Sequence, residues 1–228
     1  MTFSYGCTTE QLLKTADTVL SSEALTEGQV STGLKEALVQ GISVGVKMAS
    51  QKDGYNSSSL LRIPFPKDAE KVANTLRQIG LDKEVDRFVT TLNRGAENAA
   101  DEAKPIFISA IKSMTVQDAF GILKGDKKAA TDYLRRTTKQ QLVAAFKPKV
   151  KEALDQVNAT KYYSDLVGRY NRLPTTFNKV DPDLTNYATQ QAIDGLFKLV
   201  AKEEKHIRED INARSTELMR RVFAKQDE

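Results

Sequence analysis

Apolar residues recur every three or four positions along most of this chain, which is the spacing of one face of an α-helix. The first stripe of this kind runs from Val30 to Gly45 and includes Leu34, Leu38 and Ile42. Its glycines indicate that a neighbouring helix packs closely against it. No segment shows the sustained alternation of apolar and polar residues that is typical of β-strands. The pattern therefore predicts an all-α protein.

The segment after the first stripe carries turn signals and then prolines. Asp53-Gly54 predicts a turn, and the polar run 56–59 predicts a loop. In Ile63-Pro64-Phe65-Pro66, each proline disfavours the helical conformation of the residue before it. We therefore expect an extended, proline-containing strap near residues 55–66 that crosses the bundle and does not form a strand.

Capping residues, glycines and prolines divide the rest of the chain into further helices. A stripe over 69–79 stops at Gly80, and Asp82 is expected to cap a long helix that Pro105 must end or kink. Thr115 with Asp118 resembles a capping box. The other expected helices start near Ile106, Asp126, Thr138, Tyr162, Asp181 and Ser215, with a bend at Pro148.

The longest irregular connection runs from residue 174 to 183 and is rich in Pro, Thr and Asn. A loop of this length is the best candidate for a hinge or a boundary. The helix after it carries Ile193, Leu196 and Phe197 on one face and needs the earlier helices to bury them. We therefore expect residues 8–228 to form a single-domain multi-helix bundle of about eight to ten helices.

Composition and charge exclude several classes of protein. Hydrophobic residues make up 40% and charged residues 28%, as in an ordinary globular protein. The net charge of +4 is small for 228 residues, so bulk charge does not favour nucleic-acid binding. No apolar run approaches the roughly 20 residues that span a bilayer. A single cysteine excludes an internal disulfide.

The cysteine lies in a segment, residues 1–7, that resembles the remnant of a bacterial lipoprotein signal. Cys7 follows a short run of apolar and small residues that ends in Gly6. Such signals place a small residue before the processing site. Ser4 departs from the usual pattern, because an aliphatic residue is preferred there. We expect lipidation of Cys7 in the native precursor; the alternative is a free thiol.

Recognisable catalytic and metal-binding motifs are missing from the sequence. His206 is the only histidine. Glu203 and His206 have the Glu-x-x-His spacing of di-iron bundles, but those sites need a second such pair. The sequence contains no glycine-rich phosphate loop and no nucleophile elbow. We therefore expect no metal site and no cofactor, and the sequence favours a non-enzymatic protein.

Two polar clusters are candidates for binding an anion or a partner. Asn93, Arg94 and Glu97 share one helical surface and would place donors and a carboxylate in a groove. The alternative is an ordinary ion pair worth about 0.2–0.5 kcal/mol. Arg135 and Arg136 open the densest basic region, which fits phosphate, carboxylate or lipid headgroups beside a capped helix. The alternative there is a solvated face balanced by nearby acids.

Much of the sequence resembles one bacterial family, catalogued as the domain of unknown function DUF4197, which has no assigned activity. The resemblance covers nearly everything after Val30. The segments that carry it are Asn93 to Thr138, Gly33 to Ile42, Ile63 to Pro66, Phe146 to Tyr163 and Asp181 to Arg208. Members of this family commonly begin with a secretory or lipoprotein signal, so the resemblance implies an envelope location for this chain.

These observations favour a non-enzymatic lipoprotein that faces the periplasm, in the periplasm or at the outer membrane. It would contact the membrane through the lipid on Cys7 and recognise an unknown protein partner of the cell envelope through the surface of a rigid bundle.

Two alternatives remain open. A small-anion binding protein or hydrolase would use a polar groove near Arg94, Glu97, Arg135 and Arg136. A nucleic-acid binder would use the basic region 135–151, with an affinity that falls steeply with salt.

Overall fold

The computed structural model describes residues 24–78, 80–156, 158–172 and 179–224. Over these ranges the chain forms nine α-helices, two 3-10 helices and no β-strand, so the predicted all-α class is confirmed. The α-helices are α2 (Glu27–Ser50), α3 (Glu70–Gln78), α4 (Asp82–Ala100), α5 (Ala103–Ser113), α6 (Val116–Lys124), α7 (Ala129–Asp155), α8 (Ala159–Asn171), α9 (Leu184–Glu209) and α10 (Glu217–Phe223). The 3-10 helices are η1 (Lys67–Ala69) and η2 (Ile211–Ala213).

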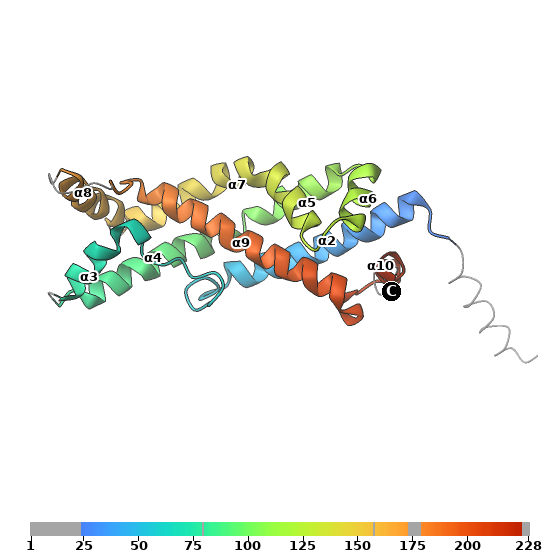
Figure 1. Cartoon of the computed structure of the whole chain (residues 1–228), viewed down its shortest axis with the longest axis horizontal. Coiled ribbons are helices and arrows are strands. Elements are labelled where there is room, and N and C mark those ends of the chain that lie inside the picture. Colours follow the sequence, from blue (N-terminus) through green and yellow to red (C-terminus); the bar gives the residue numbers. More distant parts are fainter. Residues whose placement is uncertain (1–23, 79, 157, 173–178, 225–228) are drawn as a thin grey trace, which may run out of the picture.

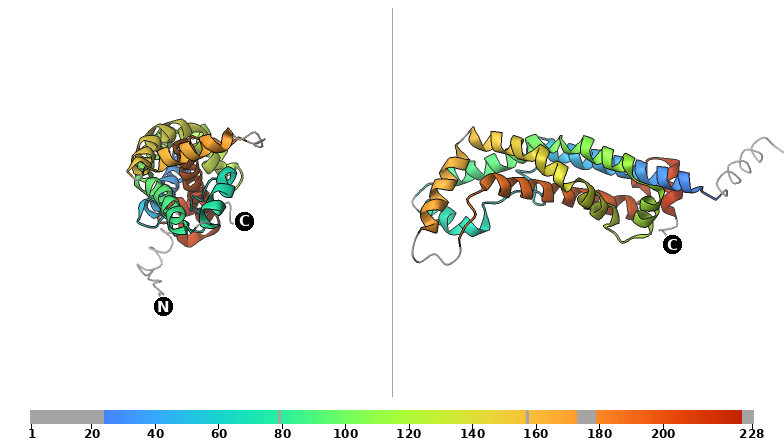
Figure 2. Two further views of the ribbon diagram at one scale, coloured as in Figure 1. Left: turned by 90° about the vertical axis from the view of Figure 1, so that its left-hand side faces the viewer. Right: turned by 90° about the horizontal axis from the view of Figure 1, so that it is seen from above.

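The molecule is an elongated bundle built along its long helices (Figure 1). Helix α7 packs against α4 and α9, and α9 packs against α2. With 24, 27 and 26 residues, helices α2, α7 and α9 are each about 36–40 Å long at 1.5 Å per residue. Helices α3 and α8 lie at one end, whereas α6, α10 and the start of α2 lie at the other (Figures 1 and 2).

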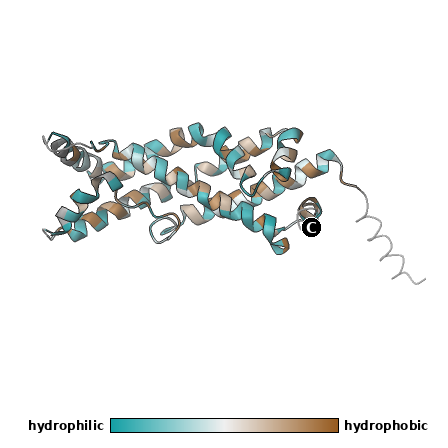
Figure 3. Ribbon diagram, viewed as in Figure 1, coloured by the Kyte–Doolittle hydropathy of each residue, from teal (hydrophilic) through white to brown (hydrophobic). Residues whose placement is uncertain are grey.

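One hydrophobic core runs through the bundle. Buried side chains from all the long helices belong to a single cluster, in which Phe107 and Phe197 meet edge to face with ring centres 5.6 Å apart. Hydrophobic and hydrophilic residues alternate along each long helix (Figure 3), as expected when one face is buried. The buried apolar area is therefore the main source of stability of the bundle.

Helix α7 corrects one predicted boundary. A helix end near Arg136 and a new start at Thr138 were expected, but α7 is continuous through both positions. The Thr138 side chain is buried and donates a 2.6 Å hydrogen bond to the Leu134 carbonyl, one turn earlier. A threonine that bonds in this way is compatible with a helix interior. Pro148 also lies inside α7 and does not end it.

Other helix boundaries differ from the predictions by up to three residues. Asp183, and not Asp181, caps α9. Thr216, and not Ser215, caps α10. Pro105 falls in the first turn of α5, where its missing N–H costs no helix hydrogen bond, so the chain breaks just before it. The Thr115 and Asp118 capping box is confirmed, and each side chain accepts a bond from the backbone of the other.

Two predicted features lie outside the described residues. These are the leader with Cys7 and residues 174–178 of the 174–183 connection. Among the residues that are described, no single helix has both the length and the hydropathy to cross a membrane. Helices α5 and α6 meet these two criteria only as a pair, and that pair is bent by 105°.

The packing of α10 on α2 depends on a glycine. A Cβ at Gly33 would lie 2.7 Å from Val222 Cγ2 and 3.2 Å from the Leu218 carbonyl oxygen. We expect Gly33→Ala to lower the free energy of unfolding by about 1–2 kcal/mol, because overpacking outweighs the helix propensity of alanine.

Gly121→Ala is the matched control for this prediction. Gly121 also lies inside a helix, but nothing is within 4 Å of a Cβ there. The free energy of unfolding of this variant should therefore rise by up to about 1 kcal/mol. Urea unfolding of both variants measures the difference. Equal effects would contradict close packing at Gly33.

Candidate functional site

The turn before the strap requires a glycine. Asp53 adopts φ 67°, a left-handed conformation that aspartate tolerates. A Cβ at Gly54 would lie 2.4 Å from the Met48 carbonyl oxygen and 2.6 Å from that of Ala49. The chain therefore turns back tightly against the end of α2 before it enters the strap, residues 55–66.

Asn93 holds the extended part of the strap against α4. Its side chain is fully buried. The Ile63 N–H donates to Asn93 Oδ1 at 2.8 Å, and Asn93 Nδ2 donates to the Ile63 carbonyl at 2.9 Å. Nδ2 also donates to the Val89 carbonyl at 2.7 Å. One amide thus gives Ile63 both of the backbone bonds that a neighbouring strand would supply.

Glu97 holds the start of the strap one turn further along α4. Its side chain is only 4% exposed. Oε1 accepts hydrogen bonds from the backbone N–H groups of Tyr55 and Asn56, at 3.1 and 3.0 Å. Oε2 accepts from Arg94 Nη1 at 2.5 Å. The buried carboxylate therefore has a partner on each oxygen, as a buried charge requires.

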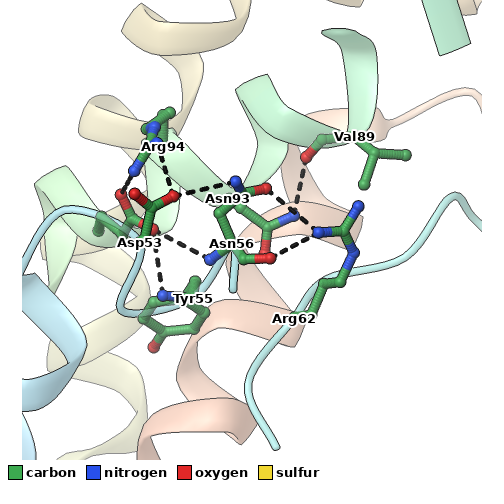
Figure 4. A network of polar contacts seen from close by, with 8 residues as sticks. Asp53, Tyr55, Asn56, Arg62, Val89, Asn93 and Arg94 are labelled. Carbon is green, nitrogen blue, oxygen red and sulfur yellow. Dashed lines mark hydrogen bonds and ion pairs between the residues drawn. The ribbon is translucent and has the colours of Figure 1, made fainter. Parts of the chain in front are cut away.

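Arg94 connects this carboxylate to the turn. Its Nη2 lies 2.8 Å from Asp53 Oδ1, which also accepts from the Asn56 side chain at 3.1 Å. Figure 4 shows Asp53 paired with Arg94 of α4, with Tyr55 and Asn56 of the same turn beside them. The hydrogen bond from Asn56, followed by the bond from Arg94, lowers the pKa of Asp53 below its ordinary value of 3.8.

The strap is also bonded to α9. The Tyr55 hydroxyl donates to the Ala192 carbonyl at 2.7 Å, and the Tyr55 ring passes 3.0 Å from where a Cβ of Gly195 would be. The Tyr187 hydroxyl donates to the Pro64 carbonyl at 3.2 Å. Burial, together with the nearby charge of Glu97, raises the pKa of Tyr55 well above its ordinary value. The strap thus joins α4 to α9.

The structure separates the four residues that were expected to form one polar groove. Arg94 and Glu97 belong to the strap contact, whereas Arg135 contacts α9, where Nη1 is 2.6 Å from Asp194 Oδ1. Gly95 of α4 faces Val150 of α7, 15 residues after Arg135. Arg94 immediately precedes Gly95, and a helix rises 1.5 Å per residue, so Arg94 and Arg135 lie about 22 Å apart along the bundle.

Arg135 and Arg136 also differ from each other in their surroundings. The Arg135 guanidinium lies 4.4 Å from the centre of the Phe197 ring and is half-buried between α7 and α9. Arg136 is exposed, 5.5 Å from the Tyr133 ring centre. The guanidinium groups of Arg135 and Arg136 therefore do not converge on one binding site.

Three lysines at the end of the basic region each have an acidic neighbour. Lys147 lies 3.9 Å from Asp183, Lys149 lies 3.8 Å from Glu102, and Lys151 pairs with Asp155 one turn along α7. These pairs offset much of the positive charge between 147 and 151. They do not favour the nucleic-acid hypothesis over the solvated-face alternative.

A second buried carboxylate, missed in the sequence, closes the α6 to α7 connection. Glu204 of α9 accepts hydrogen bonds from the N–H groups of Ala130 and Thr131, at 3.0 and 2.9 Å. These N–H groups belong to the first turn of α7, where no preceding turn satisfies them. A negative charge is also favourable at a helix N-terminus. Glu204 therefore caps α7 from another helix.

Two arginines, Arg208 and Arg214, donate hydrogen bonds to backbone carbonyls at helix C-termini. Arg208 pairs with Glu204 and donates from Nη2 to the Ile122 carbonyl at 2.8 Å, at the end of α6. Arg214 is fully buried and donates to the carbonyls of Ile207 and Arg208, at 3.1 and 3.0 Å, at the end of α9. No local sequence motif marks these roles, because Arg208 is distant in the chain from α6 and Arg214 lies beyond the end of α9.

Two recesses in the surface lie next to the residues described above. A polar hollow of about 360 Å³ lies beside Glu97 and is also lined by Asp101, Lys149 and Glu152. A larger groove of about 1460 Å³, which we call the end groove, lies between the start of α2 and the ends of α6, α9 and α10. The sequence pattern did not predict the end groove, because its walls come from four separate segments.

Metal ligation has no geometric support within the residues that the structure covers. No group of three or more His, Cys, Asp or Glu side chains there is arranged to hold a metal ion. His206 faces Glu203 at 3.8 Å and Asp210 at 3.5 Å on an exposed helix surface.

The comparisons with known proteins give one match. A family model described as a protein of unknown function, DUF4197, matches residues 24–224. No curated protein and no solved structure matches the chain.

The role of Asn93 predicts a loss of stability when its amide is removed. We expect Asn93→Ala to lower the free energy of unfolding by about 2–4 kcal/mol, because it leaves the N–H and carbonyl of Ile63 buried without partners. Asn98→Ala, at an exposed position of the same helix, is the control and should change stability by less than about 0.5 kcal/mol. Similar losses in both variants would contradict the role assigned to Asn93.

The lowered pKa of Asp53 predicts an acid-sensitive contribution to stability. The folded protein keeps this carboxylate charged at pH values where the unfolded chain already protonates it. Its contribution is therefore present above about pH 4 and is lost as the pH falls further. We expect Asp53→Asn to lower stability at pH 7 and to make the acid limb of the stability curve shallower, measured by urea unfolding from pH 7 to 2.5. A limb that matches the unmodified protein would contradict this assignment.

Proposed function

The chain belongs to the DUF4197 family of proteins of unknown function, and from that premise we propose that it is a non-enzymatic, periplasm-facing lipoprotein. In this proposal the lipid on Cys7 tethers an elongated helical bundle to a membrane. The bundle then acts as a binding or structural module for a protein partner of the cell envelope. Of the polar residues expected to line a groove, Arg94, Glu97 and Arg135 make contacts within the bundle itself.

The non-enzymatic role is supported by one observation: the buried polar side chains already bond to other parts of the bundle. Glu97, Arg94 and Glu204 each bond to backbone groups or to one another, in positions that close breaks between helices. A carboxylate whose oxygens already accept backbone and arginine donors has few lone pairs left to contact a substrate. These contacts support a structural use of the most buried polar groups.

The geometry also suits a tether at one end. Residue 24, the first described, lies at the end of the bundle that carries α6 and α10, far from α3 and α8 (Figure 1). A lipid on Cys7 would therefore hold this end near the bilayer. Diacylation supplies about 0.8 kcal/mol per buried methylene, enough to retain a domain of this size at a surface.

Lipidation can be tested directly in the native precursor. We expect Cys7→Ala to move the protein from the membrane fraction to the released fraction, and mass spectrometry of the unaltered protein to find a diacylglycerol thioether on the N-terminal peptide.

Ser4→Leu is the matched variant, because it restores the preferred aliphatic residue before the processing site. It should speed processing and leave Cys7 lipidated. A membrane-bound Cys7→Ala protein, or an unmodified cysteine in the native protein, would refute the tether.

A further inference from the structure

The end groove combines an apolar floor with charged walls. Leu25, Phe120 and Leu123 are partly buried floor residues that pack on the core. Ile211 lines the same groove and is 54% exposed. A recess of about 1460 Å³ with this lining can accept an apolar chain.

Cations outnumber acids around this floor. The walls carry three lysines and two arginines against three acids. Lys127 and Lys205 share Glu209, at 2.9 and 3.7 Å, so one carboxylate serves two cations. Lys124 lies 5.7 Å from the Phe120 ring centre, over the apolar floor.

The other two acids of the groove are already used by the backbone. Asp126 Oδ1 accepts from the N–H of Lys128 at 2.8 Å, and Asp210 Oδ1 accepts from the N–H of Asn212 at 2.8 Å. Arg208 is committed to Glu204, so the cations that face the groove beside its apolar side chains are chiefly Lys124, Lys127 and Lys205. A ligand complementary to both features carries a negative headgroup on an apolar chain.

We propose that the end groove binds an anionic phospholipid of the membrane surface. One acyl chain lies along Leu25, Phe120 and Leu123, and the phosphate lies near Lys124 and Lys205. This inference rests on the proposed function for the way the groove meets a bilayer, since the tether holds the same end there. Binding itself needs no lipid on Cys7, so the two proposals can fail separately.

The test uses the full 228-residue chain with Cys7→Ser, which removes the tether, and vesicles of phosphatidylglycerol or phosphatidylcholine. We expect cosedimentation with phosphatidylglycerol only. Lys124→Gln combined with Lys205→Gln should weaken it about tenfold or more, from the loss of two cations near an anionic surface. Lys83→Gln with Lys161→Gln, an equal charge change at exposed sites at the opposite end of the bundle, should leave it within about twofold.

A second readout distinguishes the groove from general surface charge. The chain contains no tryptophan, so Ile211→Trp introduces a single indole at the groove edge. Phosphatidylglycerol with a spin-labelled acyl chain should quench this indole, and the Lys124 and Lys205 double variant should lose the quenching.

Three outcomes would overturn the inference. These are equal binding to both lipids, equal weakening by the control variant, or vesicle binding without quenching at position 211. Occupation of the groove by residues 1–23 or by a second copy of the chain would appear as the last of these. Lipidation of Cys7 in the native protein would stand in each case.

Discussion

A backbone N–H or carbonyl that is buried must have a hydrogen-bond partner, and this constraint organises the whole bundle. The chain leaves helical structure inside the molecule at the strap, at the α6 to α7 connection and after α9. At each place a buried polar side chain supplies the missing bonds. Asn93 and Glu97 serve the strap, Glu204 and Arg208 serve the connection, and Arg214 serves the end of α9. The long helices can therefore stay packed although the chain between them is irregular.

This use of polar groups changes where recognition is to be sought. The pattern Asn93, Arg94 and Glu97 suggested either a ligand groove or an ordinary ion pair; Arg94 and Glu97 do form an i,i+3 pair, and Glu97 also bonds to the strap. The ion pair is part of a backbone clamp, and its buried carboxylate faces inward. Recognition is then left to surfaces such as the end groove, whose apolar floor and lysines take no part in these backbone contacts.

The fold class followed from the sequence because apolar spacing is a local property of each helix. The strap was likewise predictable, since Pro64 and Pro66 act on their immediate neighbours. Glu204 and Arg208 were not, because their partners lie more than seventy residues away and no local motif records the contact. The helix start predicted at Thr138 was wrong because a threonine can either cap a helix or, inside a helix, donate to the carbonyl one turn earlier, as Thr138 does to Leu134.

Native-state hydrogen exchange tests the central claim most directly. If side chains from α4 and α9 replace the missing helix bonds, the amides of Tyr55, Asn56, Ile63, Ala130 and Thr131 should be protected as strongly as the core of α9. Exchange of these five amides as fast as that of the exposed loop residue Ser59 would contradict the account.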